Sequence, residues 1–107
     1  WYGVADVLLL TSRREGRPNV VLEALASARP VLATEAGGTA EALGELAPRL
    51  LARTRDPEAL AERLRALLDA PPRAEELTAA VAHLTWEASF AALERCLAAA
   101  VAGERAA

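Results

Sequence analysis

Two glutamates, Glu15 and Glu23, carry the side chains in this sequence that are best suited to recognising a ligand. Seven residues separate them, and Glu23 falls about five residues into a predicted helix, or ~7–8 Å along its axis. Ionised carboxylates accept hydrogen bonds from sugar hydroxyls, and the free N–H groups and dipole at a helix N-terminus favour an anion. The spacing therefore suits a diphosphate that carries a hydroxylated group at each end.

Two glycine-containing loops accompany these carboxylates. Gly16 lets the backbone of the first loop come close to a ligand, and Pro18 is tolerated in the first turn of the helix that follows. Gly37 and Gly38 give the second loop the same freedom. Both loops are therefore candidate walls of one binding site.

The loops follow two short apolar runs, Val7–Leu10 and Val31–Ala33, which we predict to be strands. A helical pattern follows each loop, so a strand–loop–helix unit occurs twice and the strands should be parallel. The crossover between parallel strands is almost always right-handed, which places both loops at the carboxyl edge of the sheet. Open α/β sheets bind ligands at that edge.

The predicted helix that contains Glu23 runs from Val20 to Ala28 and is apolar nearly all round, so we expect it to be largely buried. A buried carboxylate without partners is costly and would neutralise or find a hydrogen bond. Glu23 is therefore either a ligand contact or a buried structural hydrogen-bond acceptor.

The order of these motifs resembles a known family. Glu15, seven further residues and Glu23 are followed by Ala24-Leu25-Ala26, by Pro30-Val31-Leu32-Ala33-Thr34 and by Gly37-Gly38-Thr39-Ala40-Glu41. This string is similar to the C-terminal, donor-binding domain of a retaining GT-B-fold glycosyltransferase of group 1, also called family 4. The resemblance is strong from Trp1 to Glu41 and looser as far as Trp86-Glu87.

The resemblance implies a role for each site residue. The resemblance assigns donor-sugar contacts to Glu15, Gly16, Gly37 and Gly38. It assigns phosphate contacts to Arg17, Pro18 and Asn19, and a ribose contact to Glu23. Weaker candidates for the site are Arg13, Arg14, Thr39 and Glu41. Alternatives stay open: Glu15 could cap its loop, the two glycines could form a plain turn, and Arg13 with Arg14 could be a solvated pair. Glu41 could simply complement a helix dipole. No catalytic residue, metal ligand or cofactor is implied within this chain.

The implied function is transfer of a sugar from a UDP-, GDP- or ADP-sugar donor to an acceptor hydroxyl, with retention, in the cytoplasm. Two alternatives are a GT-B-like sugar-nucleotide epimerase and a non-catalytic nucleotide-sugar-binding or interaction domain. We expect the chain to be a fragment whose partner is a missing N-terminal domain of the same enzyme, and we expect the isolated chain to be inactive. Thr11 departs from the proline usual in the family, and Ala28 stands near its usual glycine, where a left-handed conformation would cost about 1 kcal/mol.

Composition is consistent with this interpretation. The chain has 107 residues, enough for one partial domain, with an α/β donor-binding part over 1–54 and C-terminal helices over 55–107. The fold class predicted is α/β, a partial Rossmann-like parallel sheet of two to three strands with flanking helices. A net charge of −3 argues against nucleic acid or an anionic bilayer as main partner, and no apolar run reaches the ~20 residues of a membrane helix. Peripheral membrane contact is expected only through parts outside this chain.

The second half of the sequence predicts mainly helices. Leu50–Ala52 could form a short strand, Asp56-Pro57 should begin a helix, and Arg73–Ala82 should form another. Thr85 should cap a final helix with one apolar stripe, expected to be core, made of Trp86, Phe90, Leu93, Leu97 and Val101. The resemblance leaves an alternative open, in which this helix packs across the junction to the missing domain and Trp86 is more exposed. We expect no catalytic role for His83, and we expect Cys96 to be a small buried hydrophobe.

Overall fold

Three short strands form a parallel sheet in the computed structural model, which describes residues 1–103. The strands are β1 (Leu8–Leu10), β2 (Val31–Thr34) and β3 (Leu51–Ala52), in the spatial order β1-β2-β3. Leu9 pairs with Leu32 and Ala33 pairs with Leu51. The central strand β2 is buried at every position, as expected for a parallel strand covered on both faces.

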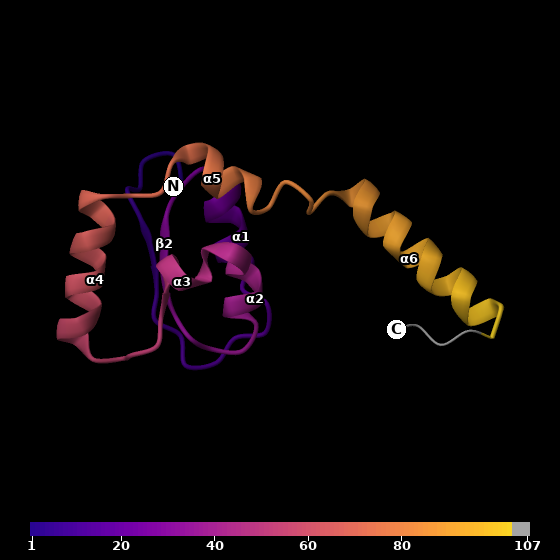
Figure 1. Cartoon of the computed structure of the whole chain (residues 1–107), viewed down its shortest axis with the longest axis horizontal. Coiled ribbons are helices and arrows are strands. Elements are labelled where there is room, and N and C mark those ends of the chain that lie inside the picture. The colour runs from indigo at the N-terminus through magenta and orange to yellow at the C-terminus, as the bar shows by residue number, and fades with distance from the viewer. Residues whose placement is uncertain (104–107) are drawn as a thin grey trace.

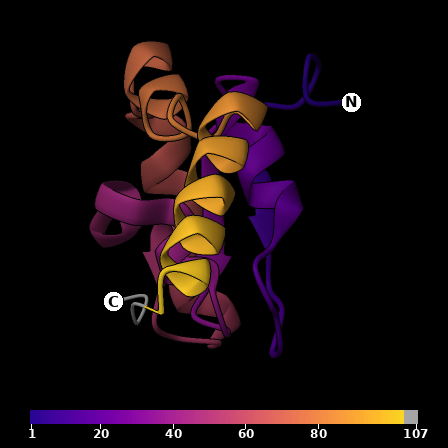
Figure 2. The same cartoon turned by 90° about the vertical axis from the view of Figure 1, so that its right-hand side faces the viewer.

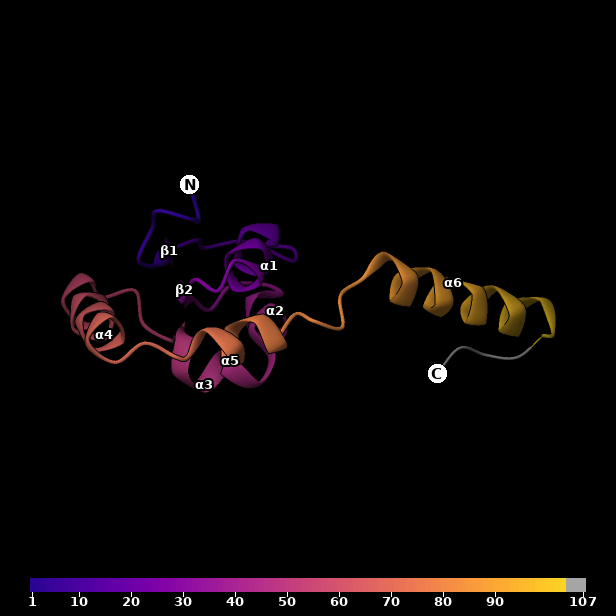
Figure 3. The same cartoon turned by 90° about the horizontal axis from the view of Figure 1, so that it is seen from above.

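Helices cover the two faces of this sheet. Besides the strands, the chain forms the following helices: α1 (Asn19–Ala26), α2 (Thr39–Leu43), the 3-10 turn η1 (Gly44–Leu46), α3 (Ala47–Leu50), α4 (Pro57–Asp69), α5 (Ala74–Ala79) and α6 (Trp86–Val101). Seen from above, α4 lies on one side of the sheet and α1 and α2 lie on the other (Figure 3). The predicted α/β fold with a partial parallel sheet and a helical second half is confirmed.

The hydrophobic core lies between β2 and the helices around it. Leu25 of α1, Leu32 of β2 and Leu43 of α2 are among its largest fully buried side chains. On the opposite face, α4 contributes the buried Leu67 and the half-buried Leu60, whereas Leu68 is exposed. The strands β1 and β2, whose carboxyl ends carry the predicted loops, therefore pack in this core.

Local sequence signals explain where α4 and α6 begin and where α1 ends. Asp56 caps α4 by accepting a hydrogen bond from the Ala59 N–H at 3.0 Å, and Thr85 caps α6 by accepting one from the Ala88 N–H at 3.1 Å. The chain leaves α1 through Ala28, whose φ is +57°, and the Arg29 N–H donates to the Ala24 carbonyl at 2.8 Å. Ala28 therefore adopts the left-handed conformation that the family's usual glycine would adopt at lower cost.

The expectation that α1 is largely buried is wrong. Val21, Ala24 and Leu25 are buried, whereas Val20 and Glu23 are exposed. The reason is that α1 covers the sheet with one face only, so its outer face remains at the surface of the described chain. Glu23 is consequently not a buried structural acceptor.

The expectation that the α6 stripe belongs to the core is also wrong. Figure 1 shows α6 projecting from the body of the molecule, and Figure 3 shows the same separation from above, whereas in Figure 2 the view runs along the molecule and α6 lies in front of the body. Trp86 is 75% exposed, and within residues 1–103 no α6 side chain is buried. Cys96, predicted to be buried, is exposed on the same helix. The physical reason is that α6 extends away from the α/β body, so that its large apolar side chains stay exposed within residues 1–103. Trp86 and Phe90 stack on each other with ring centroids 5.8 Å apart.

Candidate functional site

The two predicted loops meet at the carboxyl edge of the sheet. The Gly38 N–H, in the loop after β2, donates to the Gly16 carbonyl oxygen in the loop after β1 at 2.7 Å. Gly37 has a φ of +50°, and a Cβ there would come within 1.6 Å of the Glu15 carbonyl oxygen. Gly37 and Gly38 are therefore needed for the contact between the loops. The expectation that the two loops share one edge of the sheet is confirmed.

Glu15 is half-buried where these loops touch. The Ser12 Oγ donates to Glu15 Oε1 at 2.6 Å. The Ser12 carbonyl oxygen accepts from Thr34 Oγ1 at 2.8 Å and from Arg55 Nη2 at 3.4 Å. The Glu15 carboxylate is thus held by a residue that is itself bonded to the ends of β2 and of the segment after β3.

Glu23 lies on the exposed face of α1, and its partner comes from the start of the chain. The Tyr2 Oη donates to Glu23 Oε2 at 2.8 Å. Donating to the carboxylate raises the pKa of the Tyr2 phenol, because ionising it would remove this hydrogen bond and place two negative charges together. Arg29 donates through Nε to the Tyr2 carbonyl oxygen and through Nη2 to the Gly3 carbonyl oxygen at 3.1 Å. These bonds hold the N-terminal segment against α1.

The residues predicted to contact phosphate surround the N-terminus of α1. Pro18 is buried and occupies the cap position, where it offers no side-chain acceptor to the first N–H groups of the helix. Arg17 and Asn19 are exposed and line an open cleft of about 540 Å³ together with Trp86 and Ser89 of α6. The helix N-terminus therefore has donors available for an anion and a basic side chain beside it.

The weaker candidates differ in their surroundings. Arg13 and Arg14 are exposed in the loop between β1 and Glu15. Thr39 is fully buried, and its Oγ1 donates to the Ala36 carbonyl oxygen at 2.7 Å, so its hydroxyl is used within the loop. Glu41 is exposed in the first turn of α2, where a negative charge complements the helix dipole.

Sequence reasoning missed the residues that hold the two carboxylates. Tyr2 and Ser12 each donate a hydrogen bond to one of the carboxylates, and Arg55 donates to the carbonyl oxygen of Ser12. Ser12 stands three positions before Glu15, a spacing that could have suggested a local hydrogen bond. Nothing in the sequence pairs Tyr2 with Glu23 or Arg55 with Ser12, because these contacts depend on how the chain folds back.

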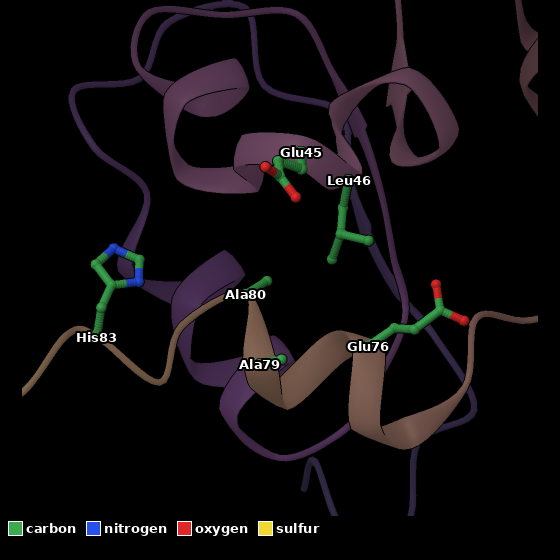
Figure 4. A pocket seen from close by; sticks show the side chains of 6 residues that line it. All are labelled: Glu45, Leu46, Glu76, Ala79, Ala80 and His83. Carbon is green, nitrogen blue, oxygen red and sulfur yellow. The ribbon is translucent and has the colours of Figure 1, made fainter.

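A separate cleft of about 420 Å³ lies between η1 and α5, away from the carboxyl edge. Figure 4 shows Glu76 and His83 at opposite ends of this cleft, which is also lined by Glu45 and Leu46. Glu76 accepts a hydrogen bond from Arg49 Nη1 at 2.7 Å and is therefore already paired. In residues 1–103, no group of three His, Cys, Asp or Glu side chains is placed to hold a metal ion. No helix in that range is long and apolar enough to cross a membrane.

Comparisons with known proteins connect this geometry to a family. A family model described as "Glycosyl transferases group 1" matches residues 1–70. D-inositol 3-phosphate glycosyltransferase 2 of Catenulispora acidiphila is 34% identical over 96 residues, which cover 86% of this chain and 22% of that protein. D-inositol 3-phosphate glycosyltransferase of Streptomyces griseus is 35% identical over 82 residues, which cover 77% of this chain and 17% of that protein. The chain thus spans about a fifth of the length of these relatives.

Proposed function

The chain belongs to the group 1 glycosyl transferases, and we propose that it forms part of the donor-binding half of such an enzyme. The donor is a nucleoside diphosphate sugar of the UDP, GDP or ADP type. The sugar moves to an acceptor hydroxyl with retention of configuration. The residues of this chain bind and orient the donor, and neither Glu15 nor Glu23 acts as a general base.

One observation carries the proposal. Along the chain, the N-terminus of α1 lies between Glu15, in the loop where the Gly38 N–H donates to the Gly16 carbonyl oxygen at 2.7 Å, and Glu23, in the second turn of the helix. This arrangement offers an anion-binding helix end between two carboxylates that can each accept sugar hydroxyls. A nucleoside diphosphate sugar has this order of groups: a ribose, two phosphates and a sugar.

The roles follow from the position of each group. The N–H groups at the start of α1, with Arg17 and Asn19 beside them, face the diphosphate and stabilise the charge that grows on it as the sugar departs. Glu15, at the junction of the loops, contacts the transferred sugar together with the backbone of Gly16, Gly37 and Gly38. Glu23, on the outer face of α1, accepts hydrogen bonds from the ribose.

The test separates the two carboxylates in the full-length enzyme. Contacts of Glu15 can tighten as the sugar approaches an oxocarbenium-like state, so Glu15→Gln should lower kcat and kcat/KM together. Glu23 is remote from the reacting carbon, and its binding is nearly uniform between ground and transition states, so Glu23→Gln should mainly raise the donor KM. Each lost charge-assisted hydrogen bond is worth ~1.5–3 kcal/mol, or roughly 10- to 150-fold.

Binding of the bare nucleoside diphosphate is the control. It should weaken in Glu23→Gln and stay nearly unchanged in Glu15→Gln, because the diphosphate lacks the sugar. The opposite pattern would show that the two roles are reversed. The names of the relatives make D-inositol 3-phosphate the first acceptor to assay, with UDP-, GDP- and ADP-sugars as donors.

A further inference from the structure

We propose that Ser12 and Tyr2 are positioning residues of the donor site, each holding one of the two carboxylates by a hydroxyl hydrogen bond. The inference rests on the donor-binding function proposed above. It assigns a role to two residues that contact Glu15 and Glu23 and that orient them before the donor arrives.

Ser12 holds the carboxylate nearer the transferred sugar. Its Oγ donates to Glu15 Oε1 at 2.6 Å, and a hydrogen bond to an ionised acceptor is shorter and stronger than a neutral one. Its own position is set by Thr34 Oγ1 and Arg55 Nη2, which donate to its carbonyl oxygen at 2.8 and 3.4 Å. Arg55 Nη2 also lies 3.0 Å from the Glu35 carbonyl oxygen. Ser12 is therefore held by the last residue of β2 and by the segment after β3, and through its hydrogen bond it restrains Glu15.

Tyr2 holds the carboxylate nearer the ribose. Its Oη donates to Glu23 Oε2 at 2.8 Å, and its carbonyl oxygen accepts from Arg29 Nε. Arg29 follows the C-terminal end of α1, and it also donates to the Gly3 carbonyl oxygen at 3.1 Å. The N-terminal segment is therefore fixed alongside the exposed face of α1, with the Tyr2 phenol directed at Glu23.

Each hydroxyl donates a hydrogen bond to one oxygen of its carboxylate, so the carboxylate can still accept hydrogen bonds from the ligand. Within residues 1–103, Glu15 Oε2 and Glu23 Oε1 have no hydrogen-bond donor, and an ionised carboxylate has about four lone-pair sites. A side chain that is ordered before binding loses less conformational entropy when the ligand arrives. The two hydroxyls thus pre-organise acceptors for the sugar and for the ribose.

The first test replaces Ser12 in the full-length enzyme. Ser12→Ala should lower kcat and kcat/KM together by about threefold to tenfold, the effect of one ordinary hydrogen bond, and should leave binding of the nucleoside diphosphate unchanged. Ser12→Thr keeps the hydroxyl and should restore most of the activity. Ser27→Ala, at an exposed serine that ends α1, is the matched control and should change neither constant.

The second test replaces Tyr2. Tyr2→Phe removes only the hydroxyl, so it should raise the donor KM and weaken nucleoside diphosphate binding by about threefold to tenfold while kcat stays the same. If Ser12→Ala and Tyr2→Phe only lower the melting temperature and leave both kinetic constants unaltered, the hydroxyls are structural and the inference is overturned.

The glutamate variants distinguish failure of this inference from failure of the proposed function. If Glu15→Gln and Glu23→Gln show the expected kinetics while Ser12→Ala and Tyr2→Phe do not, positioning by the hydroxyls is wrong and the donor site stands. If the glutamate variants themselves leave donor kinetics unchanged, the proposed function is wrong, and this inference is overturned with it.

Discussion

Glu15 and Glu23 differ in how the chain surrounds them, although the sequence presents them as a pair. Glu15 is half-buried at the junction of two loops, whereas Glu23 is exposed on the outer face of α1. A hydrogen bond is stronger where protein atoms have replaced water. Within this chain, a ligand hydroxyl should therefore gain more from Glu15 than from Glu23.

The strained backbone of Ala28 gives a prediction for stability. A left-handed conformation costs a residue with a Cβ about 1–2 kcal/mol, and glycine avoids that cost while losing about 0.5–1 kcal/mol of chain entropy. Ala28→Gly should therefore stabilise the 107-residue chain by about 0.5–1 kcal/mol. For a chain of this size the melting temperature should rise by roughly 2–6 °C, measured by circular dichroism.

A second glycine substitution controls for this effect. Ala61 is exposed and lies within α4, where glycine costs about 0.5–1 kcal/mol relative to alanine. Ala61→Gly should therefore lower the melting temperature. If both substitutions lower it, the φ of +57° at Ala28 does not describe the molecule in solution.

For single residues, contacts between neighbours in the chain could be predicted from the sequence, whereas contacts between distant parts of the chain could not. The caps Asp56 and Thr85 were predicted correctly because helix caps are determined by neighbours in the chain, and the left-handed turn at Ala28 lies at the position where the family's glycine drew attention to it. Tyr2 and Arg55 could not be predicted, because their partners lie 21 and 43 residues away. The glycine pair was identified, but its contact with the Glu15 and Gly16 backbone was not.

Among the elements, α5 is attached to α3 by a charged pair whose strength depends on pH. Glu76 accepts hydrogen bonds from the Arg73 Nε and backbone N–H at 3.2 and 3.4 Å, and from Arg49 Nη1 of α3 at 2.7 Å. The hydrogen bonds from Arg73, and then the one from Arg49, lower the pKa of Glu76 below its ordinary value of 4.5. A lowered pKa in the folded state contributes stability above the ordinary pKa, and this stability is lost as the pH falls through the lowered one.

Glu76→Gln should therefore lower the melting temperature at neutral pH, and the difference from the unsubstituted chain should disappear as the pH falls below about 4.5. Thermal unfolding of both chains across an acid-to-neutral series measures this. Glu75→Gln, at the exposed neighbour in the same turn, should have little effect at any pH. A difference for Glu76→Gln that persists undiminished at acid pH would contradict the assigned ion pair.

The arrangement of elements was predictable where apolar periodicity and chain order act together. Val7–Leu10 and Val31–Ala33 correspond to β1 and β2, and Leu50–Ala52 contains β3. The sidedness of α1 was not predictable, because an apolar sequence does not reveal which of its faces another element covers. The same limit applies to α6, whose apolar stripe has a regular helical spacing but is exposed within residues 1–103.

The whole molecule is elongated, with principal extents of 54 × 26 × 21 Å, because α6 extends away from the α/β body (Figure 1). The carboxyl edge belongs to the body, and the open cleft beside Arg17 and Asn19 connects it to the start of α6. Within residues 1–103, the proposed donor site is thus a surface with Glu23 exposed on its outer side. A diphosphate bound at this surface, as we propose, would remain in contact with water.

We therefore expect the isolated 107-residue chain to transfer no sugar. Sugar transfer needs a site that excludes water from the reacting carbon and surrounds the departing diphosphate with fixed dipoles, and the described residues supply one open side of such a site. The assay combines the isolated chain with UDP-, GDP- and ADP-sugars and D-inositol 3-phosphate, and it follows both transfer and hydrolysis of the sugar. The full-length enzyme and its Glu15→Gln variant, measured alongside, show that the assay detects activity that depends on this site. Turnover by the isolated chain would contradict the proposal that these residues bind the donor without completing the reaction.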